Sequence, residues 1–264
     1  MVPLGRFNLG QLIRMGRSGP DDDMERVMTV SDWARAEAYY WRRMLPFCGR
    51  RSVLPDPGFR LPPWTLRADT DAAGGSLVHW GYGTGAVMGE HLWCYLPWGE
   101  LINSDATYWD GKRLSNKMSA WELVGPLMVL TAGVELVSNR SLIIPVDNAG
   151  SMAIYQKGWC TSCMLCTTLA LAISVVASSI NCRLEIIKVR RCSTLGAEAA
   201  DAFSKADFIK FRRLKPLSNL NPAIVPRTLV DWVLNPVEDR ELGDRLLREL
   251  GIEKNVMGHH SAFR

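Results

Sequence analysis

The chain is predicted to form an α/β fold, a mixed five-stranded sheet with helices on both faces, with helical extensions before and after it. Two observations predict this fold. Three strand-like segments with glycine-containing connections come first, and helical and strand-like segments then alternate. With 264 residues, 47% of them hydrophobic and 22% charged, the chain can bury a sizeable core. We expect three units: residues 1–63, 64–211 and 212–264.

The first unit, residues 1–63, is predicted to hold one amphipathic helix and a linker. Ser31 is a typical N-cap, Asp32 lies at the favourable end of the helix dipole, and Pro46 ends the helical pattern. Residues 52–64 are rich in proline, which favours a linker between this helix and the α/β unit.

The α/β unit begins with strands predicted at residues 65–71, 79–88 and 91–96. Short connections that contain glycine favour antiparallel hairpins. Side chains two apart share a face of a strand, so the polar ones of the first strand should lie together: Arg67, Asp69 and Asp71. A carboxylate at the end of a central strand suits a metal ion, but an aspartate before a glycine turn is also ordinary turn chemistry. This segment alone leaves both interpretations open.

A helix is predicted over residues 118–137, and it carries Glu122. Ser119 and Glu122 have the spacing of a capping box, which competes with a metal-binding role for Glu122. Pro126 is expected to start or kink the helix close to this carboxylate.

Two further carboxylates follow on other elements. Asp147 ends an apolar strand predicted at residues 141–147, which leads into a short helix at 148–157. A final strand is predicted at residues 183–191, and Asp201 lies on the alanine-rich helix after it. The fold must therefore bring four carboxylates together from separate elements: Asp71, Glu122, Asp147 and Asp201.

Residues 159–182 contain no charged side chain, a length that invites a membrane-spanning interpretation. We instead expect a helix buried against the sheet, because the segment is rich in Ser, Thr and Cys and no second span accompanies it. No membrane partner is expected.

After residue 211, prolines break the chain, and two short amphipathic helices are predicted to pack on the domain or on a neighbouring module.

Cysteine usage and charge give broader indications. Seven cysteines without a secretory signal favour reduced thiols and an intracellular protein, nuclear or cytoplasmic. Cys160, Cys163 and Cys166 form CxxCxxC, but no fourth ligand is near in sequence, so we expect packing on a helix. The net charge of +4 is small, yet residues 183–215 hold nine basic and four acidic residues. This segment is either a phosphate-binding surface or a solvated charged face.

Five segments resemble, in order, the ribonuclease H domain of retroelement reverse transcriptases, most of all the DIRS-like elements of the tyrosine-recombinase class. The segments are DTDAAGG, HWGYGTGAVM, KMSAWELVGPL, VDNAGSMAIYQKGW and RCSTLGAEAADAFSKADF, within residues 64–211. The helix after Ser31 resembles the link between polymerase and ribonuclease H. The polymerase signature, a tyrosine followed after one residue by two aspartates, is absent, so at most the tail of a polymerase is present.

The resemblance implies a ribonuclease H-like fold, in which the first strand is central and the fourth lies parallel beside it. It implies two Mg²⁺ ions (Mn²⁺ being an alternative), with Asp71 bridging them, Glu122 and Asp147 on one ion and Asp201 on the other. The implied reaction cleaves the RNA strand of an RNA–DNA hybrid, leaving a 3′-hydroxyl and a 5′-phosphate. The implied partners are this hybrid and the reverse transcriptase module of the same element. Nucleic-acid contacts are expected from four residues: Asn148, Lys188, Arg190 and Arg191.

Two departures from the family pattern matter. Asp69 is a second carboxylate on the face of Asp71, and we prefer Asp71 because the small-residue turn follows it directly. No histidine lies between the last predicted strand and Asp201, where many ribonucleases H carry one, which bears on product release.

Two other functions stay open. A domesticated or decayed element fragment could bind nucleic acid or protein without cutting, and an integrase-like or resolvase-like nuclease would fit the carboxylates but not DTDAAGG or VDNAGS.

Overall fold

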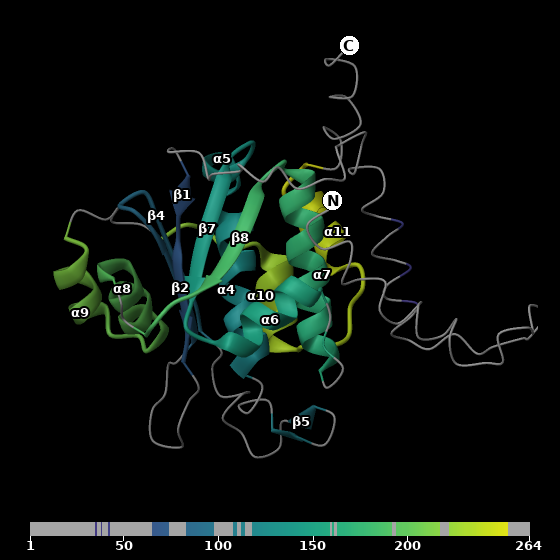
Figure 1. Cartoon of the computed structure of the whole chain (residues 1–264), viewed down its shortest axis with the longest axis horizontal. Helices are drawn as coiled ribbons and strands as arrows, with labels where there is room; N and C mark the ends of the chain where they lie inside the picture. Colours follow the sequence, from purple (N-terminus) through teal and green to yellow (C-terminus); the bar gives the residue numbers. More distant parts are fainter. Residues whose placement is uncertain are drawn as a thin grey trace, which may run out of the picture.

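The computed structural model describes residues 35, 38, 42, 65–73, 83–97, 108–109, 112–113, 118–158, 160, 163–191, 194–216 and 222–252. Within these residues the chain forms an α/β structure with eight helices, one parallel and one antiparallel three-stranded sheet, and a two-stranded hairpin (Figure 1). Of the predicted N-terminal helix only Arg35, Ala38 and Arg42 are described, and all three are helical. The rest of residues 1–63 lies outside the described residues, as does the Gly74–Gly75 turn.

The antiparallel sheet has the order β2-β3-β4, and its strands are β2 (Asp69–Ala72), β3 (Gly83–Met88) and β4 (Leu92–Pro97). The predicted antiparallel hairpins are therefore confirmed. Asp71 pairs with Gly85 and Thr70 with Ala86, so alternate residues of β2 and β3 face opposite sides. Tyr108–Trp109 (β5) and Lys112–Arg113 (β6) form the separate two-stranded hairpin.

The parallel sheet has the order β1-β7-β8, and its strands are β1 (Leu66–Arg67), β7 (Ser141–Val146) and β8 (Arg183–Lys188). Leu66 pairs with Leu142, so the first and fourth predicted strands lie parallel, as expected. The predicted single five-stranded sheet is wrong: there are two three-stranded sheets. The reason lies at Ala68, where β1 ends its pairing with β7 and β2 begins its pairing with β3. The Ala68 N–H still donates to the Ile143 carbonyl at 3.1 Å, but no residue of the segment pairs with both neighbours.

Helices cover opposite faces of the β2–β3 pair (Figure 1). On one face lies α4 (Met118–Ala132), where Gly125 lets the helix approach Thr70 so closely that an added Cβ would lie 2.7 Å from the Thr70 Cβ. On the other lies α8 (Leu195–Ser204), where a Cβ on Gly85 would lie 2.8 Å from that of Phe203. The predicted helix over 118–137 is instead divided at Gly133, after which α5 (Val134–Val137) begins.

Two helices follow β7. Asn148 caps α6 (Ala149–Lys157) by accepting the Ser151 N–H at 3.1 Å, and Gly158 ends the helix with a φ of +75°. Beyond it, α7 (Met164–Ser179) is buried on nearly all sides, as expected. The helix was expected to pack against the sheet, but it packs mainly between α4 and α11, with only a minor contact to β8. No helix among the described residues is both long and apolar enough to cross a membrane.

The C-terminal part packs on this core. After α8 come α9 (Phe208–Leu214), α10 (Arg227–Leu234) and α11 (Leu242–Glu249). Gly243 lets α11 lie close against Val175 of α7, and Leu242, Leu246 and Leu247 are buried there. The two predicted amphipathic helices thus bury their apolar faces against the α/β core itself.

Candidate functional site

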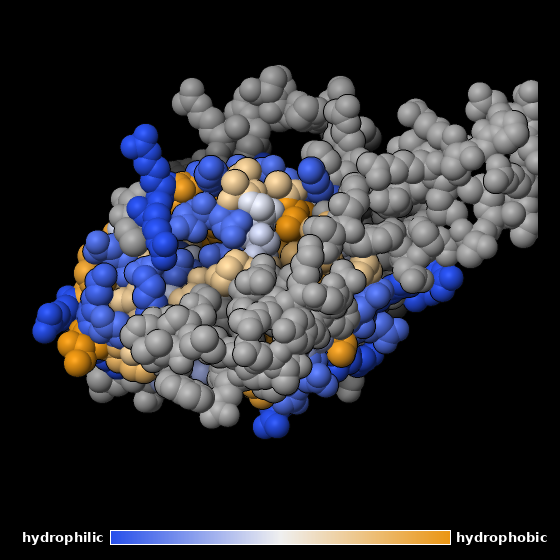
Figure 2. All heavy atoms as spheres, turned by 90° about the horizontal axis from the view of Figure 1, so that it is seen from below, coloured by the Kyte–Doolittle hydropathy of each residue, from blue (hydrophilic) through white to orange (hydrophobic). Residues whose placement is uncertain are grey.

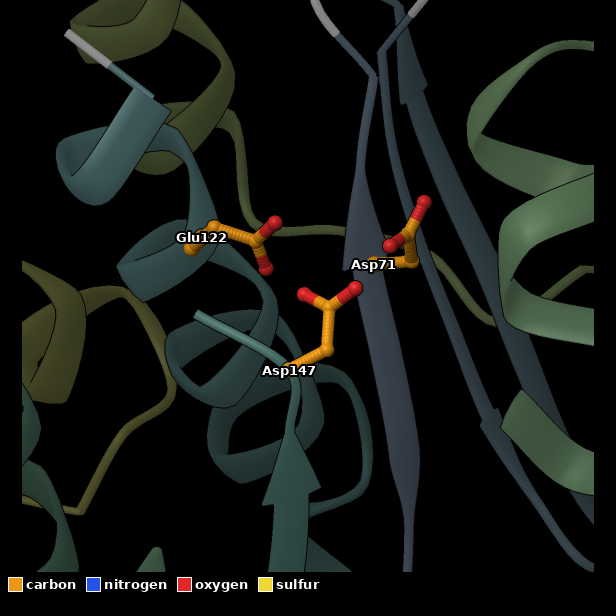
Figure 3. Close-up of side chains that lie close together, drawn as sticks. All are labelled: Asp71, Glu122 and Asp147. Atoms are coloured by element: carbon orange, nitrogen blue, oxygen red, sulfur yellow. The ribbon is translucent and has the colours of Figure 1, made fainter. Parts of the chain in front are cut away.

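Three of the four predicted carboxylates meet at one end of the sheets. Asp71 lies near the end of β2, Glu122 in the second turn of α4, and Asp147 directly after β7. One carboxylate oxygen from each lies within 4.8 Å of the other two, and the three side chains converge from separate elements (Figure 3). Asp71 and Glu122 are buried, and Asp147 is half-buried. The chain runs from β1 through Ala68 into β2, and β1 is parallel to β7. Asp71 on β2 and Asp147 after β7 therefore lie at the same end.

Glu122 points into this group and not into a helix cap. Ser119 lies inside α4 together with Glu122, so the capping box expected from their spacing is not what holds the glutamate. Its carboxylate accepts the backbone N–H of Ala72, at the end of β2. The strand that carries Asp71 therefore also orients Glu122.

Burial dominates the electrostatics of the group. Burial, followed by the charges of Asp71 and Asp147, raises the pKa of Glu122 to about 9. Burial raises the pKa of Asp71 to about 6, against a lowering by its hydrogen bond from Ser204 and with smaller contributions from Asp201 and Asp147. Without a cation Glu122 therefore keeps its proton at neutral pH, and a bound divalent cation would displace it.

Asp201 lies beside the group but outside it. Its Oδ1 accepts from Lys205 Nζ at 2.6 Å and from Arg191 at 3.0 Å. Burial acts to raise the pKa of Asp201, but the hydrogen bonds and charges of Lys205 and Arg191 lower it overall. Three carboxylates are thus brought together, and the fourth is neutralised by basic side chains.

Ser204 connects Asp201 to Asp71 and was not predicted as a site residue. Its fully buried hydroxyl donates to Asp71 Oδ2 at 2.6 Å and lies 2.9 Å from the Asp201 carbonyl. The sequence could have indicated Ser204 as a site residue, because it follows Asp201 by three residues and so lies on the same side of α8. The helix is held there by aromatic packing, since the ring of Phe203 lies 5.0 Å from that of Trp93 and 4.3 Å from that of Phe211.

Asp69 shares the face of Asp71, as the strand period predicts, but belongs to a different cluster. It forms an ion pair with Arg67 at 2.9 Å and accepts from the Thr194 hydroxyl at 3.4 Å. Thr194 also caps α8 by accepting the Ala197 N–H at 3.2 Å. Asp69 therefore fixes the start of α8, while Asp71 takes the position beside Glu122 and Asp147.

The predicted nucleic-acid contacts have separate structural settings. Lys188 is exposed at the end of β8, and Arg190 is exposed two residues after it. Arg191, with 63% of its side chain exposed, lies 3.7 Å from Asp147 and 3.0 Å from Asp201. Asn148 is the N-cap of α6. Seen from below Figure 1, hydrophilic side chains cover much of the molecule on the side of α8 and α9 (Figure 2). Lys205 directly follows α8, and α9 carries Lys210, Arg212 and Arg213.

Comparisons of this chain with models of protein families, with curated proteins and with solved structures find no match.

Proposed function

We propose that the chain is a metal-dependent endonuclease of ribonuclease H type that cleaves the RNA strand of RNA–DNA hybrids, as part of a retroelement polyprotein. The observation that carries the proposal is the convergence of Asp71, Glu122 and Asp147. These residues lie in three of the five motifs through which the sequence resembles this family. The reverse transcriptase module of the same element would be the partner of the domain.

The strand arrangement supports the fold that the proposal requires. The two sheets share the segment Leu66–Ala72, so the order β4-β3-β2 continues through Ala68 into β1-β7-β8. Read across that junction, the first segment is central and the fourth strand lies parallel beside it. A ribonuclease H-like sheet with an interruption at Ala68 has this order.

The residues present fit divalent cations. Carboxylate oxygens are the ligands that Mg²⁺ prefers, together with water and substrate phosphate. Asp71, Glu122 and Asp147 would hold the first ion, and Asp201, once freed from Arg191, would complete a second site with Asp71. Bound in pairs, such ions activate a water molecule and stabilise the leaving oxygen of the phosphodiester.

The chain's own residues would prepare and align this site. Ser204 holds one oxygen of Asp71, and the N–H of Ala72 holds the Glu122 carboxylate, so neither side chain has to be ordered when substrate arrives. The exposed cations Lys188, at the end of β8, and Arg190, two residues after it, follow the strand next to the one that precedes Asp147, where they can contact substrate phosphates. Discrimination of RNA from DNA would rest on the 2′-hydroxyl.

The test is cleavage of an end-labelled RNA–DNA hybrid by the full chain, with Mg²⁺ and with chelator. We expect Mg²⁺-dependent cuts in the RNA strand that leave 3′-hydroxyl and 5′-phosphate ends. Asp147→Asn should abolish them, with an unchanged circular dichroism spectrum. Duplex DNA of the same sequence is the substrate control. Full activity of Asp147→Asn, or equal activity in chelator, would contradict the proposal.

One observation favours a second candidate, a non-catalytic module that binds nucleic acid or protein. Arg191 lies 3.7 Å from Asp147 and 3.0 Å from Asp201 and places one positive charge beside both carboxylates without a metal ion, as a decayed site would. This candidate requires that the full chain binds the hybrid with Mg²⁺ present and cuts neither strand. The variant Arg191→Ala distinguishes a decayed binding module from a nuclease whose site is blocked. Restored cutting in that variant would show that only the arginine blocks the site.

A further inference from the structure

Aromatic rings form a continuous group on the α8 face of the antiparallel sheet, outside the carboxylate site. Contacts with ring centroids 4.3–5.7 Å apart join Trp93 and Tyr95 of β4, Phe203 of α8, and Phe208 and Phe211 of α9. Phe203 and Phe211 are buried, whereas Phe208 is 47% exposed. The group therefore reaches the surface of the molecule at Phe208.

The exposed ring of Phe208 is held in one orientation by its neighbours. It meets Tyr95 edge to face, with centroids 5.7 Å apart and planes at 88°, and meets Phe203 in the same way at 5.4 Å and 87°. Because these contacts already fix the ring, a second flat ring that stacks on it costs little additional conformational entropy. Ile209, which is 71% exposed, extends the apolar surface on the next residue of α9.

Cations accompany this ring along α9, which lies beside α8 at the outside of the molecule (Figure 1). Residues 205–215 hold five basic residues and one acidic residue, which is the N-cap of α9. Lys210 and Arg213 are exposed, and no carboxylate among the described residues forms an ion pair with either. The guanidinium of Arg212 lies 5.3 Å from the centroid of the Trp93 ring. The surface thus combines an exposed aromatic ring with positive charge.

The aromatic group is connected to the carboxylate site through one row of the sheet. Asp71 pairs with Gly85, and Gly85 pairs with Tyr95, so the three residues follow one another across β2, β3 and β4. Two strand spacings place the backbone of Tyr95 roughly 10 Å from that of Asp71. The surface at α9 is therefore close to the carboxylates, but it shares no residue with them.

We propose that the surface formed by Phe208, Ile209, Lys210 and Arg213 binds single-stranded nucleic acid. A base stacks on the exposed ring of Phe208, and Lys210 and Arg213 contact the adjoining phosphates. Every base has a flat face, so no sequence preference is expected. A strand of nucleic acid fits this surface better than a protein does, because charged residues are depleted from the core of protein interfaces. This binding requires neither a metal ion nor cleavage, so it does not depend on the proposed nuclease activity.

The test is fluorescence anisotropy of the full chain with short labelled single strands of DNA and of RNA, in chelator so that neither is cut. Phe208→Leu keeps an apolar side chain but removes the flat ring, so it should weaken binding about five- to 100-fold. Phe208→Tyr keeps the ring and should bind as the unchanged chain does. Val237→Ala is the matched control, because Val237 is 45% exposed and lies outside α9, and it should leave binding unchanged.

The cations provide a second variant that leaves the aromatic packing intact. Lys210→Gln combined with Arg213→Gln should reduce the slope of log affinity against log salt concentration by about one to two. Arg248→Gln, which removes an exposed cation of α11, is the control and should keep most of the slope. The proposal would be overturned if the unchanged chain bound no single strand at low salt, or if Phe208→Leu and the double variant both bound as it does.

Two further outcomes would assign the surface differently and so overturn the proposal. An equal loss of single-strand and duplex binding in Phe208→Leu would show that the ring supports the fold and does not stack on bases. Light scattering provides the other outcome. Self-association of the unchanged chain that is lost in Phe208→Leu, while single strands bind as before, would make the surface an interface between copies of this chain.

Discussion

Glu122 and Asp201 flank Asp71 from opposite faces of β2, and their surroundings differ. Glu122 projects from α4, which contains no other charged residue, and its pKa is raised to about 9. Asp201 projects from α8, where Lys205 and Arg191 bind its carboxylate and lower its pKa. The two faces therefore neutralise negative charge in different ways.

The difference indicates where a cation is needed. On the α8 side the chain supplies its own positive charges, so Asp201 is stable as an anion. On the α4 side the charge of Arg191 acts on Glu122 and Asp71 only as a small contribution, and the pKa of both stays raised, so a proton or an added cation is favoured there. We therefore expect the first metal ion to bind among Asp71, Glu122 and Asp147, and the second to require release of Asp201 from Arg191.

The largest expected effect separates Asp71 from Asp69. Asp71→Asn should lower hybrid cleavage by at least about 10³-fold, equivalent to roughly 4 kcal/mol of transition-state stabilisation, at any Mg²⁺ concentration. Asp69→Asn should be rescued by raising Mg²⁺, because Asp69 pairs with Arg67 and adds only negative potential. Initial rates across a Mg²⁺ titration provide the measurement. Equal, unrescued loss in both variants would show that Asp69 is itself a ligand.

Two glycines allow each face to be displaced separately. Gly125→Ala should push α4 and Glu122 away from Thr70, and Gly85→Ala should push α8 away from β3 at Phe203. Each should cost about 1–3 kcal/mol of unfolding free energy by overpacking. We expect Gly125→Ala to weaken Mg²⁺ binding more, as measured by calorimetry beside urea unfolding. Equal weakening of Mg²⁺ binding in the two variants would contradict the expected difference between the α4 face and the α8 face of the β2–β3 pair.

The pH dependence of stability should have opposite signs on the two faces. Glu122 keeps its proton in the folded chain up to a pKa of about 9 but loses it near 4.5 when unfolded, so it costs stability as pH rises through that interval. In chelator, the unfolding free energy should fall from pH 5 to 9, and Glu122→Gln should flatten most of the fall.

Asp201 provides the contrasting variant. Its lowered pKa contributes stability above its ordinary value of 3.8, and this stability is lost as pH falls through the folded pKa. Asp201→Asn should therefore destabilise the chain at neutral pH and leave the fall between pH 5 and 9 in place. Urea titrations at several pH values test both variants, and a fall unchanged in Glu122→Gln would contradict the assignment.

The smallest effect concerns Arg191. Its guanidinium competes with metal for Asp147 and Asp201, but its side chain is largely exposed. Arg191→Gln should therefore tighten Mg²⁺ binding only about two- to fivefold, the range that exposed ion pairs allow. Calorimetric titration with Mg²⁺ gives the result, and Arg190→Gln, one residue earlier and exposed, is the matched control. Weaker binding in Arg191→Gln would mean that the arginine supports the site.

Local patterns predicted much of the fold and of the site. The strand period placed Asp69 and Asp71 on one face, the apolar run before Asp147 indicated its strand, and the uncharged segment indicated the buried helix α7. The division of the first strand at Ala68 was not predictable, because it depends on which neighbour each half pairs with. The break at Gly133 was missed because the hydrophobic pattern continues across it.

By itself, the sequence indicated the elements that carry the carboxylates and the antiparallel hairpins, because these follow from periods of a few residues and from short connections that contain glycine. The parallel pairing of the first and fourth strands was implied only by the family resemblance. Only the tertiary structure decided that Asp71 joins Glu122 and Asp147 while Asp69 binds Arg67, and that Asp201 pairs with Arg191 and Lys205. Both carboxylates of β2 face the same side, so the strand period cannot separate them. What separates them is the packing of α8, which brings Thr194 to one and Ser204 to the other across more than a hundred residues of chain.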